Sequence, residues 1–237
     1  MRRVGVRFRH DPSAAVLRDR HDGPVPRDVS PTELPGALAA AGVGAGRPVG
    51  LAWSRAPYGV GLAYGDVVLR CAGAPDDVTA AVRQAVSELR PRLVWWSARD
   101  AAALLRTGDG AAPAPWVPST WDVAASHRLL HGGTSSDPAV VWAVARGLDP
   151  DDRPRTGQLD LLSAGPDAGD PVDPDEPVRS DGHLRPGWVA DGPPTPAAAA
   201  RWAAAALEVQ AVHEQELAAL PDGRPDPGTP GLAVLTA

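Results

Sequence analysis

The stretch PVGLAWSRAPYGVGLAYGDVVLRC, residues 48–71, decides the fold that we expect for this chain. Its apolar residues fall into three short runs, at 48–54, 60–64 and 67–71. The segments between them, 57–59 and 65–66, contain Pro, Gly and Asp, which are the residues that tight turns favour. Short apolar runs joined by tight turns predict an antiparallel meander of three strands.

Downstream of the meander, the sequence alternates between helix and strand patterns. Apolar residues recur at helical spacing from Val78 to Leu89, and Arg90-Pro91 ends this helix. The run LVWW at 93–96 is typical of a buried strand. Because successive strand residues face opposite sides, Trp95 and Trp96 are expected in different layers. Further helices are predicted at 98–106, 121–131, 137–147 and 196–220, and Ser119 with Thr120 is expected to cap the second of these. A chain that begins with several strands and then alternates between strands and helices is predicted to form an α/β fold with a mixed sheet.

The remaining segments define the expected organisation of the chain. Residues 3–9 alternate like a half-buried strand, and Ser30-Pro31-Thr32-Glu33 has the sequence of a capping box before a short helix. Residues 148–194 are rich in Pro, Asp and Gly, so we expect a long irregular crossing loop that is either ordered in patches or partly disordered. The first part of the α/β domain would then cover 1–147, a long helix at 195–221 would complete it, and 222–237 would form a tail.

Composition removes several classes of function. All 23 basic residues are arginine, so the chain lacks the lysine of a Walker-type phosphate loop and of a Schiff-base enzyme. The net charge of −6 argues against a dedicated nucleic-acid binder, whose footprint is usually basic. The single cysteine, Cys71, excludes an internal disulfide and a cysteine-based zinc site, and we expect a cytoplasmic setting. No apolar run approaches the ~18 residues of a membrane helix, so no membrane partner is expected.

Four segments carry a family resemblance: LVWWSARDAAALL at 93–105, STWDVAASHRLLHGG at 119–133, RSDGHLRPGWVADGPPTPAAAARW at 179–202 and ARWAAAALEVQAVHEQELAAL at 200–220. In this order they resemble the 3′–5′ exonuclease-type domain in front of a family A DNA polymerase of the DNA polymerase I type. The likeness is greatest to high-GC bacterial proteins described as bifunctional 3′–5′ exonuclease/DNA polymerase. It implies an RNase H-like fold of the DEDD exonuclease type, and a polymerase module that lies outside this chain.

The resemblance also implies a two-metal phosphoryl transfer, with Mg²⁺ or Mn²⁺ ions held by carboxylates. The family needs an Asp-x-Glu on the first strand, an Asp after the middle strand, and a Tyr with an Asp four residues later in the last helix. Here residues 49–54 contain no carboxylate, Trp202 takes the tyrosine position and Ala206 the final aspartate position. Asp100 is the one possible remnant. We therefore expect no catalytic residues, no metal site and no cofactor in this chain.

Histidines offer a second candidate site. His127 and His131 lie four residues apart on one predicted helix, a spacing that can bind a metal. Arg128 stands where H-E-x-x-H has its glutamate, and a cation beside a metal is unfavourable, so the sequence favours surface or capping histidines. His213, next to Glu214, is predicted to lie on a solvated helix face.

Clusters of acidic, aromatic and basic residues could each bind a ligand, but each also has a purely structural explanation. The acidic residues at 149–152 and 167–176 lack the spacing of a calcium loop and predict a solvated segment. The indoles at positions 53, 95 and 96 could stack on bases, but core packing is the prediction. The arginines at positions 3, 7 and 9 could contact phosphates, but a solvated strand face is favoured.

The sequence thus predicts a degenerate 3′–5′ exonuclease-like domain that supports DNA replication or repair synthesis by a polymerase module. DNA would be its partner through that module, and no nucleic-acid-binding residue is singled out. Two alternatives stay open. The chain could be a non-enzymatic interaction module whose acidic 148–194 segment binds a protein, or an active exonuclease with rearranged carboxylates drawn from Asp100, Asp122 or Glu208.

Overall fold

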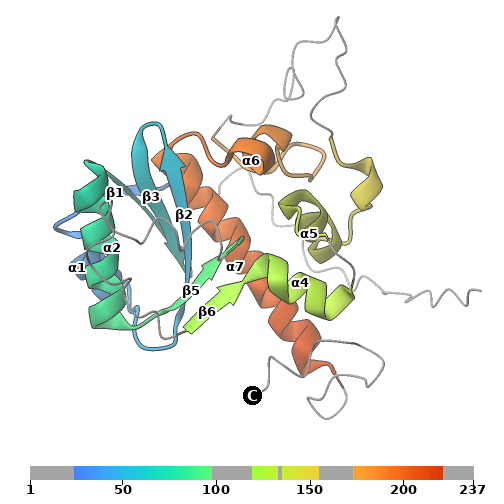
Figure 1. Cartoon of the computed structure of the whole chain (residues 1–237), viewed down its shortest axis with the longest axis horizontal. Coiled ribbons are helices and arrows are strands. Elements are labelled where there is room, and N and C mark those ends of the chain that lie inside the picture. The colour runs from blue at the N-terminus through green and yellow to red at the C-terminus, as the bar shows by residue number, and fades with distance from the viewer. Residues whose placement is uncertain (1–23, 98–118, 133–134, 155–172, 174, 221–237) are drawn as a thin grey trace, which may run out of the picture.

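A computed structural model of the chain describes residues 24–97, 119–132, 135–154, 173 and 175–220 (Figure 1). These residues form a mixed sheet of six strands in the order β1-β4-β3-β2-β5-β6. Strands β2 (Pro48–Arg55), β3 (Tyr58–Tyr64) and β4 (Val67–Ala72) form the predicted antiparallel meander. Strand β1 (Arg27–Val29) pairs in parallel with β4. On the other side, β5 (Arg92–Trp95) and β6 (Ser119–Asp122) continue the sheet in parallel from β2. The prediction of an α/β fold with a mixed sheet is confirmed.

Helices cover both faces of this sheet (Figure 1). Helices α1 (Leu34–Ala40) and α2 (Pro75–Leu89) lie on one face. The long helix α7 (Pro196–Ala218) crosses the other face, beside α4 (Val123–His131) and α5 (Pro138–Ala145). The 3₁₀ helix η2 (Pro150–Asp152) and α6 (Pro186–Asp191) pack against α5. None of the described helices is both long and apolar enough to cross a membrane.

Glycine and alanine let α7 lie unusually close to the sheet. The face of β2 and β3 under α7 carries Gly50 and Gly61. A Cβ atom at Gly61 would overlap the backbone of Ala200, and one at Gly50 would overlap the backbone of Ala203. The alanine-rich composition of α7 therefore has a direct role, because small residues on both surfaces are what allow this close approach.

The sheet separates two apolar cores. Trp95 packs with the residues of α1 and α2, whereas Trp96 packs with those of α7. Trp96 Nε1 also donates to the carbonyl oxygen of Trp202 at 3.0 Å. The expected placement of the two adjacent indoles in different layers is confirmed.

Several sequence predictions need correction. Ser119 and Thr120 belong to strand β6 and do not cap a helix; the N-cap of α4 is Asp122. Strand β1 was not predicted, because two of its three residues are charged. Helix α1 begins at Leu34, after a turn in which Ser30 N–H donates to Glu33 Oε2 at 3.0 Å. The segment 148–194 is irregular only in part, since it contains η2 and α6. The predictions for 3–9, 98–106 and 222–237 lie outside the described residues.

Candidate functional site

A pocket of about 580 Å³ opens at the carboxyl ends of β2 and β5. Helices α4 and α6 and residue Trp202 of α7 complete its walls. Strands β2, β5 and β6 are parallel to one another, so their carboxyl ends meet at the same edge of the sheet. This edge is where open α/β sheets bind their ligands, and the volume is in the usual range of ligand pockets.

Indole rings dominate the lining of this pocket. The tryptophans that reach it are Trp53, Trp95, Trp96, Trp188 and Trp202. The ring centres of Trp96 and Trp202 are 4.8 Å apart, and Trp188 meets Trp202 edge-on at 6.0 Å. All five are largely buried, so the pocket has a rigid aromatic wall. The sequence prediction that Trp53, Trp95 and Trp96 pack in the core is correct, and the structure adds that the same rings line a pocket.

Four charged residues also line the pocket: Arg55, Arg128, Asp122 and Asp191. Asp122 caps helix α4, because its Oδ1 accepts the Ala125 N–H at 2.8 Å. Asp191 lies at the end of α6. With two positive and two negative side chains, the lining carries no net charge.

The residues that the sequence resemblance assigned to metal-ligand positions have different locations in the structure. Trp202 lines the pocket, whereas Ala206, one turn further along α7, is fully buried. Glu208 is not in the pocket lining and lies 3.5 Å from Arg146 as an ion pair. Asp122 and Glu208 are therefore not brought together in the pocket. Asp100 lies outside the described residues.

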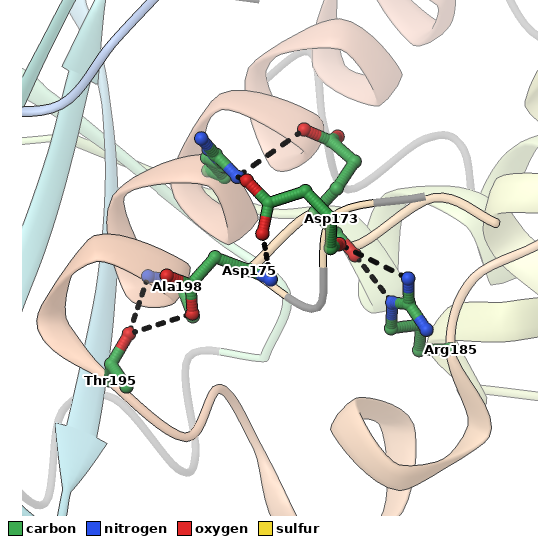
Figure 2. A network of polar contacts seen from close by, with 7 residues as sticks. Asp173, Asp175, Arg185, Thr195 and Ala198 are labelled. Atoms are coloured by element: carbon green, nitrogen blue, oxygen red, sulfur yellow. Dashed lines mark hydrogen bonds and ion pairs between the residues drawn. The ribbon is translucent and has the colours of Figure 1, made fainter. Parts of the chain in front are cut away.

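The wall formed by α6 is held in place by a network that Figure 2 shows. Arg185, which is 4% exposed, donates from Nε to the Glu176 carbonyl at 2.7 Å and from Nη2 to the Asp173 carbonyl at 3.1 Å. Thr195 caps α7 by accepting the Ala198 N–H at 3.0 Å. Its hydroxyl also lies 3.4 Å from a carboxylate oxygen of Asp175.

Asp173 belongs to the same network. Its carboxylate accepts the Asp175 N–H at 2.9 Å and pairs with Arg201 at 3.2 Å. The Asp175 N–H, together with the Arg201 guanidinium, holds the pKa of Asp173 below its ordinary value in spite of partial desolvation. Asp173 is exposed, as predicted for a solvated acidic segment, but Asp173 and Asp175 also bond to Arg185, Arg201 and Thr195 and so join this segment to the starts of α6 and α7.

A second candidate site lies between α4 and α7. His127 and His131 of α4 face His213 of α7, and one ring nitrogen of each lies within 4.8 Å of the others. The ring centres are 4.6 Å apart for the α4 pair, and 6.0 and 6.2 Å from the ring of His213. His127 is 4% exposed and His213 is 0% exposed. Burial, with smaller effects of neighbouring charges, lowers the pKa of both to about 4, so both are neutral at pH 7.

This arrangement corrects two predictions from the sequence. His213 does not lie on a solvated face, and His127 is not a surface histidine. A signal for His213 was present, because positions 202, 206, 209 and 213 fall on one side of a helix, and the first three are apolar. What the sequence could not show is that this side meets α4, since His131 and His213 are far apart in the chain.

No protein-family model matches this chain, and it has no significant similarity to a curated protein or to a solved structure.

Proposed function

We propose that this chain is an RNase H-like, exonuclease-type domain of a family A DNA polymerase that has lost its nuclease chemistry. In this proposal, the indole-lined pocket holds the end of a DNA single strand for a polymerase module outside the chain. The observation that carries the proposal is the lining of the pocket, which has five indoles and only two carboxylates.

The strand order supports the choice of fold. An antiparallel meander is followed by two strands that add in parallel beside its first strand, in the order β4-β3-β2-β5-β6. This is the arrangement expected of an RNase H-like sheet, and α7 packs on it as the family resemblance implies (Figure 1). In such a sheet the metal-binding carboxylates would stand at the carboxyl ends of β2 and β5, where the pocket is.

The pocket chemistry argues against hydrolysis. A two-metal centre needs several carboxylates that converge on both ions. The part of β2 that lines the pocket carries Leu51, Ala52 and Trp53. Asp122 already accepts a backbone hydrogen bond as the cap of α4, and Arg128 adds a positive charge to the same lining. Loss of the carboxylates removes the charge that would hold two cations.

The same lining suits a single-stranded nucleic acid. Stacking of a base on an aromatic side chain contributes about 1–3 kcal/mol and tolerates any base. Arg55 and Arg128 can each take one phosphate. Two such contacts predict a slope of about −1.4 in a plot of log affinity against log salt concentration, because each single-strand phosphate contributes about −0.7. Binding would therefore depend more on stacking than on charge.

Two measurements on the full chain test the proposal. Incubation with single-stranded DNA and either Mg²⁺ or Mn²⁺ is expected to release no nucleotides. Tryptophan fluorescence should be quenched when a short oligonucleotide binds, and Arg128→Gln should weaken binding at least several-fold. Arg47→Gln is the matched control, because Arg47 is exposed at the opposite end of β2 and should leave the affinity unchanged.

Each result has a defined consequence. Metal-dependent hydrolysis that disappears in Asp122→Asn would favour the active exonuclease and refute our proposal. Equal loss of DNA binding in Arg47→Gln and Arg128→Gln would show that the pocket is not the binding site. No observation favours the interaction-module alternative, because the described acidic residues of 148–194 that form the network in Figure 2 are bonded to α6 and α7.

A further inference from the structure

The three histidines between α4 and α7 form a site of their own. None of them lines the indole pocket, so an inference about them is independent of the DNA-binding proposal. His127 and His131 come from successive turns of α4, and His213 approaches from α7. Two helices that are separate in sequence thus bring three nitrogen ligands to one point.

The spacing of the ligand atoms fits a single small cation. Three nitrogens within 4.8 Å of one another have a centre no more than about 2.8 Å from each. Zinc–imidazole bonds are about 2.0–2.1 Å long, so side-chain shifts of about 0.7 Å would complete the coordination. Rotation about the side-chain torsions of a histidine can supply movements of this size without displacing either helix.

Burial gives an independent reason to expect a ligand. Among the described residues, neither ring nitrogen of His213 has a hydrogen-bond partner, and Nδ1 of His127 has none. Burying a polar group without a partner costs about 1–3 kcal/mol. A single metal ion would satisfy a nitrogen of each ring, which an apolar neighbour cannot do.

A carboxylate lies beside one member of this cluster. Glu216 lies one turn after His213 on α7, and its Oε2 is 3.2 Å from Nε2 of His131. Two ligands at the tetrahedral angle around zinc are about 3.3 Å apart, which follows from the zinc bond lengths. The separation between Glu216 and His131 therefore fits two zinc ligands, but only the three histidines converge in the structure, so the Glu216 side chain has to turn towards His127 and His213 to join them.

We propose that His127, His131 and His213 bind one Zn²⁺ ion. Glu216 supplies the fourth ligand and closes a tetrahedral site of three nitrogens and one oxygen. Imidazole ligands suit zinc, and four protein ligands are typical of structural zinc sites. His131 is the exposed member of the set, so the ion enters from the solvent past its ring. The bound ion joins α4 to the last turns of α7.

The test uses the untagged full chain, first stripped of metal with a chelator. Titration with Zn²⁺ should show one ion bound per chain by calorimetry and by metal analysis. Zinc at about 100 times its Kd should raise the Tm by about 5–10 °C. Co²⁺ in place of zinc should give the visible absorption of a tetrahedral site.

Three variants define the ligands. His131→Ala removes a surface ligand and should weaken zinc binding at least tenfold without unfolding the chain. Glu216→Gln removes the carboxylate and should also weaken binding at least tenfold. His213→Leu replaces the unpaired buried imidazole with an apolar side chain, so the metal-free Tm should stay the same or rise while the zinc-induced increase disappears.

His183→Gln is the matched control, because His183 is buried in a different part of the chain, outside the cluster. It should keep one zinc ion per chain and the full increase in Tm. The proposal is overturned if the wild-type Tm does not respond to Zn²⁺ or Co²⁺. It is also overturned if zinc binds with unchanged affinity to His131→Ala or His213→Leu, since the ion would then be bound elsewhere.

Discussion

Replacing Gly61 by alanine is the sharpest test of how this fold is packed. Gly61 lies in the middle of β3, under α7. An added Cβ would meet backbone atoms of Ala199 and Ala200 well inside van der Waals contact. Both partners are main chain in regular structure, so no side chain can rotate away. The helix or the strand would have to move as a whole.

The size of the effect follows from this rigidity. Overpacking a core by a methyl group usually lowers the free energy of unfolding by about 1–3 kcal/mol. An overlap with main-chain atoms should cost at least as much as the upper end of that range, because the backbone cannot rotate away as a side chain can. We therefore expect Gly61→Ala to reduce the free energy of unfolding by about 3 kcal/mol or more. For a chain of this size, each kcal/mol lowers the Tm by about 2–4 °C, so a decrease of about 6–12 °C is expected.

Urea unfolding and calorimetry would measure this effect, and the chain offers a matched control. Gly36 lies inside helix α1 with no atom within 4 Å of an added Cβ. The same substitution there should stabilise the chain by about 0.5–1 kcal/mol, because alanine is the better helix residue. Adding Ala200→Gly to Gly61→Ala should give no rescue, since the overlap is with main-chain atoms. A stability of Gly61→Ala within about 0.5 kcal/mol of wild type would refute the reasoning.

Four further outcomes can be measured. Burial raises the pKa of the Cys71 thiol from 9.0 to about 11, so the native chain should resist iodoacetamide at pH 8.5, whereas the urea-unfolded chain should react fully. The pKa of Cys71 is higher in the folded chain than in the unfolded chain, so the contribution of Cys71 to stability is complete below pH 9 and is lost as the pH rises through about 11. Urea unfolding measured across this pH range would detect the loss. Asp122→Ala removes the cap of α4 and should cost about 1 kcal/mol in urea unfolding. Thr195→Ala should cost a similar amount and increase proteolysis near α6, because Thr195 both caps α7 and contacts Asp175.

The meander and α7 could be predicted because their signals are local. The alternation of β2 to β4 and the turns between them lie within one short stretch of sequence, and Thr195-Pro196 marks the start of α7 directly. The edge strands carry no such signal. Strand β1 pairs with β4 partly through Asp28 and Arg70, whose side chains form a two-contact ion pair at 2.6 and 2.7 Å. An ion pair between distant residues has no local pattern in the sequence.

The two sites illustrate the same limit. The family resemblance drew attention to Trp202 and Ala206, but the lining of the pocket also depends on Trp188 of α6, a helix in a segment predicted to be a crossing loop. The i, i+4 spacing of His127 and His131 was recognised as a possible metal pair. The third histidine could be found only once the packing of α7 against α4 was known, because that contact is set by tertiary structure.

Helix α7 connects all of these features. Trp202, Ala206, Val209 and His213 lie on one side of it and are almost completely buried. Trp202 and His213 are about 16 Å apart along the helix axis, given a rise of 1.5 Å per residue. One row of side chains on α7 therefore contributes Trp202 to the indole pocket at one end and His213 to the histidine cluster at the other. The same helix packs against β3 where Ala200 contacts Gly61. A substitution under the helix, such as Gly61→Ala, should disturb both sites. His213→Leu changes only one end of the row and should leave the DNA binding proposed for the indole pocket intact. Comparing the two variants therefore distinguishes effects that arise from a shift of α7 from effects that arise from the loss of one side chain.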